Sequence, residues 1–119
     1  MNHYSKVITL LKPVVLAAIS TVLAASCAPL EKAAPPVSEL TLPKKANRKK
    51  LEEGRQLYAT ACIHCHGPAR VDRHGSDENW TQNILPKMCP KAKLSAAETE
   101  ALQEYVLAAR QSLAKPASG

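Results

Sequence analysis

One short motif constrains this chain more than any other feature: Cys62-Ile63-His64-Cys65-His66, two cysteines three residues apart with a histidine directly after the second. Side chains three and four residues apart share one face of a helix. At the end of a helix, the motif would therefore present two sulfur atoms and one imidazole together.

The spacing matches C-x-x-C-H, the sequence at which a haem is attached covalently. Both sulfurs would meet the two vinyl groups of one porphyrin, and His66 would reach the iron from the same face. A thioredoxin-like pair would require a βαβ pattern, and a zinc site recruiting His74 would normally need two separated ligand pairs. A disulfide would leave His66 without a role. The motif predicts one haem c, held by Cys62 and Cys65 with His66 as an axial ligand.

The composition favours a fold that a cofactor helps to fill. The 119 residues include no Phe, one Trp and three Tyr. Domains shorter than about 70–80 residues usually need a disulfide, a metal or similar support. A large, mostly apolar haem would supply the missing core.

The first 26 residues have the order of a secretory signal peptide. A short start carries Lys6 and Lys12, an apolar run extends from Pro13 to Ala25, and small residues follow. The run is shorter than the roughly 20 residues of a transmembrane span, although an uncleaved anchor helix is the alternative. We therefore expect export to a compartment where thiols tend to be oxidised.

The end of this segment, Leu23-Ala24-Ala25-Ser26-Cys27, resembles a bacterial lipoprotein signal. Leu23 lies one position earlier than is usual for that signal. The resemblance implies that Cys27 becomes the first mature residue and carries a lipid. It also implies anchoring in the periplasm, by default at the outer membrane. Ordinary cleavage after Ser26, which would leave Cys27 as a plain thiol, is the alternative.

The next segments divide into a tether, a domain and a tail. Residues 27–46 are rich in proline without helical or strand periodicity, which predicts an extended spacer. The folded domain is expected over 47–114 and a tail over 115–119. A basic cluster at the boundary would face headgroups, an acidic partner or solvent, and contains Lys44, Lys45, Arg48, Lys49 and Lys50.

The patterning of the domain predicts an all-α fold. A first helix would begin near the N-cap Asn47 and continue to about Ala61, and Gly54 within it suggests close approach by another backbone. A second begins at the Ser95–Glu98 capping box. Its apolar stripe contains Leu102, Tyr105, Val106, Ala109 and Leu113, and Pro116 would stop it. The simplest packing sets the two stripes together, with Gly54 and Ala109 allowing a close crossing.

These elements together resemble the class I cytochrome c family. The likeness spans about 47–113 and rests on Gly54-Arg55-Gln56-Leu57-Tyr58, on Cys62-Ile63-His64-Cys65-His66-Gly67 and on Leu102-Gln103-Glu104-Tyr105-Val106. It implies a compact fold in which the N- and C-terminal helices cross around one covalent haem. It also implies a methionine as the second axial ligand.

Met88 is the candidate for that ligand, because it lies before the last helix and the only other methionine is the first residue. His74 is the rival ligand, and Met88 packing against the ring is the alternative role. The 22 residues from His66 to Met88 suggest that the helix normally found between the ligands is reduced or lost. Trp80 would bond a haem propionate or pack in the core.

Cys89 is unexpected beside a haem ligand. A buried inert thiol, a bridge to Cys27, an intermolecular bridge and competition for iron all remain open. Arg70 and Arg73 would pair with propionates or lie on the surface.

One-electron transfer is the chemistry that these residues favour, without enzymatic activity. The formal charge of +6 suits redox partners with an acidic docking surface, and no nucleic-acid-binding motif is present. The alternatives are a haem enzyme or sensor with an open or labile sixth position, and a haem-free lipoprotein that uses the two thiols.

Overall fold

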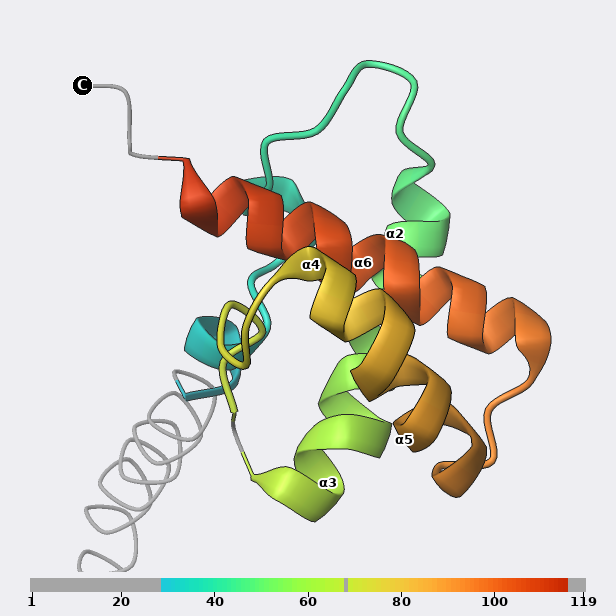
Figure 1. Cartoon of the computed structure of the whole chain (residues 1–119). Coiled ribbons are helices and arrows are strands. Elements are labelled where there is room, and N and C mark those ends of the chain that lie inside the picture. The colour runs from blue at the N-terminus through green and yellow to red at the C-terminus, as the bar shows by residue number, and fades with distance from the viewer. Residues whose placement is uncertain (1–28, 68, 116–119) are drawn as a thin grey trace, which may run out of the picture.

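Every regular element in the described part of the chain is helical. A computed structural model describes residues 29–67 and 69–115 (Figure 1), and the predicted signal peptide and Cys27 lie outside these residues. Residues 29–33 are helical. The elements that follow are η1 Val37–Glu39, α2 Arg48–Leu57, η2 Tyr58–Cys62, α3 Ile63–His66, α4 Asp77–Asn79, η3 Trp80–Ile84, α5 Leu85–Lys91 and α6 Ala96–Ala114. Within the described ranges there is no strand, so the all-α class is confirmed.

The segments α2, η2 and α3 form one continuous helix that carries the cysteine motif. The Asn47 side chain caps its start by accepting a hydrogen bond from the Lys50 amide at 3.2 Å. A π-helical turn follows, closed by the Ile63 N–H donating to the Tyr58 carbonyl. The helix extends to His66 rather than ending near Ala61, and Gly67, with φ of 69°, terminates it.

A second continuous helix, made of α4, η3 and α5, occupies the region before Met88. The prediction of a reduced or absent helix between the two ligands was wrong. The Ser76 hydroxyl caps its start by accepting from the Asn79 amide at 3.2 Å. Its middle is again π-helical, with the Leu85 N–H donating to the Trp80 carbonyl. Pro86 is the second residue of α5 and follows the π-helical turn directly.

The last helix, α6, is capped as the sequence predicts. The Ser95 hydroxyl accepts from the Glu98 amide at 3.2 Å, and the Glu98 carboxylate accepts from the Ser95 amide at 2.7 Å. The helix ends at Ala114, and Lys115 is extended, as expected for a residue before proline. Leu113 is 41% exposed and so lies outside the core, unlike the rest of the predicted stripe.

Helices α2 and α6 pack against each other (Figure 1), and their backbones approach closely at Gly54. A Cβ built on Gly54 would lie 2.1 Å from the Ala101 carbonyl oxygen and 2.7 Å from the Tyr105 Cβ. Only glycine therefore permits this approach. The partner residues are Ala101 and Tyr105 rather than Ala109, which is buried elsewhere in the core.

Between Ala33 and Leu40 the proline-rich segment packs into the core and is not the extended spacer that the sequence predicted. Ala34 and Val37 have 0% and 1% exposure and belong to the main hydrophobic core. The Ala33 carbonyl accepts from the Val71 amide at 3.1 Å, and the Pro35 carbonyl accepts from the Tyr105 hydroxyl at 2.9 Å. This part of the segment is thus a component of the fold.

No helix within the described ranges is both long and apolar enough to cross a bilayer.

Candidate functional site

The four residues predicted to hold a haem line a single cavity. The cavity has a volume of about 550 Å³, within the range of roughly 300–1,000 Å³ typical of cofactor and small-molecule sites. Cys62, Cys65, His66 and Met88 all contribute to its wall. Most other lining residues are apolar, among them Ala61, Ile63, Ala69, Ile84, Leu85, Ala92, Leu94 and Leu102.

The cysteine motif reaches the cavity from the end of the first helix. Cys62 closes η2, and Cys65 and His66 belong to α3. Because the backbone is helical through all three, Cys65 and His66 lie one turn beyond Cys62 on the same side. Cys62 is half-buried, whereas Cys65 and His66 are exposed.

Met88 reaches the same cavity from α5. Its side chain is half-buried. Met88 lies in a helix rather than in a loop. Backbone hydrogen bonds, and the burial of Leu85 and Cys89 in the same short helix, therefore fix the direction of the Met88 side chain.

The two helices that supply the candidate ligands share an unusual construction. Each contains a π-helical turn that opens with a buried aromatic residue, Tyr58 in one and Trp80 in the other. The ring centroids of these residues lie 6.5 Å apart, and both rings line the cavity. His66 follows Tyr58 at the same separation along the chain as Met88 follows Trp80. π-Helical turns inside α-helices occur frequently at functional sites.

The wall of the cavity disfavours charge on its buried groups. Burial raises the pKa of the Cys62 thiol to about 11, and the neighbouring thiols of Cys89 and Cys65 add to the effect. Burial also raises the pKa of Tyr58 to about 12. The Tyr58 hydroxyl stays protonated and donates to the Ala69 carbonyl at 2.7 Å.

These properties argue against the redox and zinc interpretations of the two cysteines. Reactive thiols usually lie at helix N-termini or beside positive charge, which lower the thiol pKa. Here the pair lies at a helix C-terminus, where the helix dipole disfavours a thiolate. In the part of the chain that the structure describes, no three His, Cys, Asp or Glu side chains gather into a metal-binding group.

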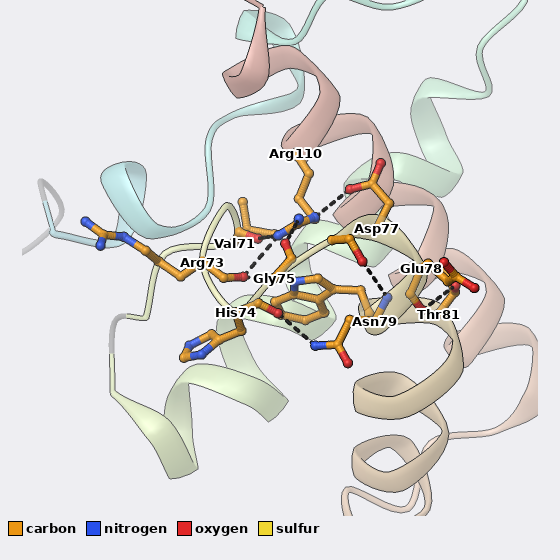
Figure 2. A network of polar contacts seen from close by, with 11 residues as sticks. Val71, Arg73, His74, Gly75, Asp77, Glu78, Asn79, Thr81 and Arg110 are labelled. Carbon is orange, nitrogen blue, oxygen red and sulfur yellow. Dashed lines mark hydrogen bonds and ion pairs between the residues drawn. The ribbon is translucent and has the colours of Figure 1, made fainter.

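Arg110 organises the loop that leads from the cavity to α4 (Figure 2). It is only 8% exposed, and its guanidinium donates to the Val71 and Arg73 carbonyls, each at 3.0 Å. It also bonds the Gly75 carbonyl and pairs with Asp77 at 2.7 Å. The sequence signal was a charged residue one turn after Val106, on the apolar stripe, and sequence reasoning missed it.

His74 lies on this loop and is exposed, as the sequence suggested, yet it also lines the cavity. Its φ of 70° is unusual for a residue with a side chain. The side-chain amide of Asn79 donates a hydrogen bond to the His74 carbonyl at 2.9 Å. Figure 2 shows the imidazole pointing away from Arg110.

Two of the three side chains considered for propionate binding already have polar partners. The Trp80 indole N–H already donates to the Arg73 carbonyl at 2.9 Å, and the ring is 5% exposed, so Trp80 is a packing residue. Arg70 pairs with Asp72 at 2.6 Å, which holds the pKa of that carboxyl below its usual range. Arg73 is exposed.

The chemistry of the donor set fits a covalently attached haem. Two thiols on one helical face suit the two vinyl groups of one porphyrin, and an imidazole and a thioether come from separate helices of one apolar cavity. A mainly apolar wall also matches the nature of the macrocycle. Cys62, Cys65, His66 and Met88 would hold the group.

Comparisons of the chain with protein-family models, with characterised proteins and with solved structures gave no match.

Proposed function

We propose that this protein is a mono-haem c-type cytochrome that carries one electron at a time between redox partners. The observation that carries the proposal is the convergence of Cys62, Cys65, His66 and Met88 on one apolar cavity. The motif and the methionine are separated in the sequence, and no local pattern requires them to meet.

The proposal includes a cytochrome c fold. The crossing of α2 and α6 at Gly54 supports it, because the class I family, which the chain resembles, joins its terminal helices at a glycine. The motif at the end of the first helix and the methionine before the last helix have the order expected for that fold.

Each candidate residue has a separate role. Cys62 and Cys65 would form thioethers, which fix the orientation of the macrocycle. His66 and Met88 would occupy the two axial positions, and such ligation raises the potential and leaves no open coordination site. When bound, the haem supplies one-electron exchange at iron. The protein controls it by burial, through the apolar side chains around the cavity.

The proposed setting is the bacterial periplasm, with Cys27 carrying a lipid at the outer membrane. The redox partners would have acidic docking surfaces. Lys91 lines the cavity and would meet such a surface, together with the exposed Lys87 and Lys93 close to it in the sequence. Charge of this kind steers encounter more than it adds affinity.

The second candidate function is a haem enzyme or sensor with an open or labile sixth position. The presence of His74 on the cavity wall favours it, because two side chains then compete for one position. Carbon monoxide binding to the reduced protein at neutral pH would support this alternative.

Absorption spectra of the exported protein, oxidised and reduced, test the main proposal. We expect the spectrum of haem c and the near-infrared band of methionine–iron ligation. Met88→Ala should abolish that band and lower the potential, whereas the matched variant His74→Ala should retain it. A colourless protein after export alongside the haem-attachment machinery would refute the proposal, and an unchanged spectrum in Met88→Ala would refute the axial assignment.

A further inference from the structure

A patch of exposed basic side chains lies where the chain enters α2. This basic patch consists of Lys44, Lys45, Arg48 and Lys49. The first two occupy the middle of a tight turn, which the Ala46 amide closes by donating to the Pro43 carbonyl at 3.0 Å. Leu42 and Ala46, on either side of the turn tip, pack against the core. The turn therefore presents its two lysines to solvent on a fixed backbone.

The charge of the basic patch is not neutralised at close range within the described residues. The ion pairs found there involve other cations, namely Lys50, Arg70 and Arg110. Glu52 and Glu53 follow one turn later on α2, beyond ion-pairing distance of the patch, and the first turn of α2 contains no acidic residue. Cations at a helix N-terminus oppose the helix dipole. The stability of the fold does not explain the patch, which points to a partner outside the chain.

The basic patch and the cavity lie at opposite ends of the first helix (Figure 1). The backbone is helical from Arg48 to His66, so these ends are separated by roughly 25 Å. Lys91, by contrast, lines the cavity itself. A redox partner docked on the patch would be far from a haem in the cavity, and electron exchange slows steeply with distance. The patch is therefore poorly placed to be the surface through which electrons pass.

We propose that the basic patch binds the anionic phospholipid headgroups of a membrane, and leaves the cavity at the other end of the helix open to redox partners. Each lysine near an anionic membrane surface strengthens binding about fivefold. No aromatic side chain lies between residues 42 and 50 to stack on a nucleic-acid base. Binding through the patch requires neither the haem nor the lipid at Cys27.

Vesicle binding by the chain 28–119, exported behind an ordinary cleavable signal peptide, tests the proposal in the absence of Cys27. The probes are phosphatidylcholine vesicles with and without phosphatidylglycerol, and cosedimentation measures the bound fraction. The parent should bind only the vesicles that contain phosphatidylglycerol, and added salt should weaken this binding because it screens exposed charges.

Two triple variants remove the same charge from different ends of the domain. The patch variant carries Lys44→Gln, Lys45→Gln and Lys49→Gln. The matched control carries Lys87→Gln, Lys91→Gln and Lys93→Gln. Vesicle affinity should fall by about a hundredfold in the patch variant, since three contributions are lost, and should remain close to the parent value in the control. Thermal unfolding should show that the patch variant is at least as stable as the parent, because the cation removed at the start of α2 opposes the helix dipole.

Failure of the parent to bind vesicles that contain phosphatidylglycerol would overturn the proposal. Equal weakening in both triple variants would also overturn it, because binding would then follow net charge alone. In the haem-loaded protein, oxidation by the anion ferricyanide should slow in the control and not in the patch variant. The opposite result would make the patch a redox docking surface instead. A colourless chain whose vesicle binding depends on the patch would refute the proposed function while supporting this proposal.

Discussion

Arg110 holds the loop from Val71 to Gly75, which carries His74 at the cavity wall. Its guanidinium donates to the Arg73 and Gly75 carbonyls (Figure 2). It also lies 5.7 Å from the centroid of the Trp80 ring. A buried guanidinium is stable only when its donors are paired. Here the loop backbone supplies the acceptors, so the charge and the loop stabilise each other.

Replacing Arg110 with glutamine should destabilise the fold. The Val71, Arg73 and Gly75 carbonyls would lose a charged donor, at a cost on the order of 3 kcal/mol. Urea denaturation followed by circular dichroism measures the change. Arg70→Gln is the matched control, because its pair with Asp72 is exposed and should contribute little. Equal stability of both variants would contradict the role of Arg110.

At the scale of elements, the helices that the sequence predicted are those with explicit terminal signals. Asn47, Ser95 and Glu98 make the capping bonds that their residue types predict. The helix from α4 to α5 was missed, although Ser76 caps it in the same way. Pro86 and Pro90 within α5 obscured its helical pattern, and the two π-helical turns shift the apolar periodicity away from 3.6 residues.

Gly54→Ala should destabilise the crossing of α2 and α6. Alanine has the higher helix propensity by about 1 kcal/mol, but its Cβ would collide with the Ala101 carbonyl. Overpacking of this kind typically costs about 1–3 kcal/mol, and the backbone contact prevents an easy adjustment.

The free energy of unfolding from urea titration measures this effect. The matched control is Glu53→Ala, at an exposed position of the same helix, which should leave stability within about 0.5 kcal/mol. A Gly54→Ala protein as stable as the control would show that the crossing tolerates a wider separation.

At the scale of the whole molecule, two buried tyrosines connect the central helices to the segments on either side. The Tyr105 hydroxyl donates to the Pro35 carbonyl at 2.9 Å, and the Tyr58 hydroxyl donates to the Ala69 carbonyl at 2.7 Å. Their ring centroids lie 6.3 Å apart. The aromatic residues of the described ranges, Tyr58, Trp80 and Tyr105, therefore meet in the core, and Tyr105 joins the proline-rich segment to it.

Stability should decrease as the pH rises above about 10. The pKa of Tyr58 is about 12 in the folded protein and 10.0 as its ordinary value, so the unfolded chain loses this proton first. The stability that the raised pKa of Tyr58 contributes is fully present below pH 10 and disappears as the pH approaches 12. It is on the order of 2 kcal/mol.

Urea titrations between pH 8 and about 11 measure this dependence. Tyr58→Phe should weaken it by removing the titrating hydroxyl. Identical pH profiles for Tyr58→Phe and the parent would contradict the assignment. Burial also raises the pKa of Tyr105, which accounts for any pH dependence of stability that remains in Tyr58→Phe.

The sequence alone determined the all-α class and the start of both principal helices, because caps and periodicity are local properties. It also identified the cysteine motif. Tertiary structure decided that Met88 shares the cavity of that motif, that residues 33–40 belong to the core and that Arg110 is buried. These outcomes depend on contacts between distant segments, where the burial of apolar surface and the pairing of polar groups are settled together.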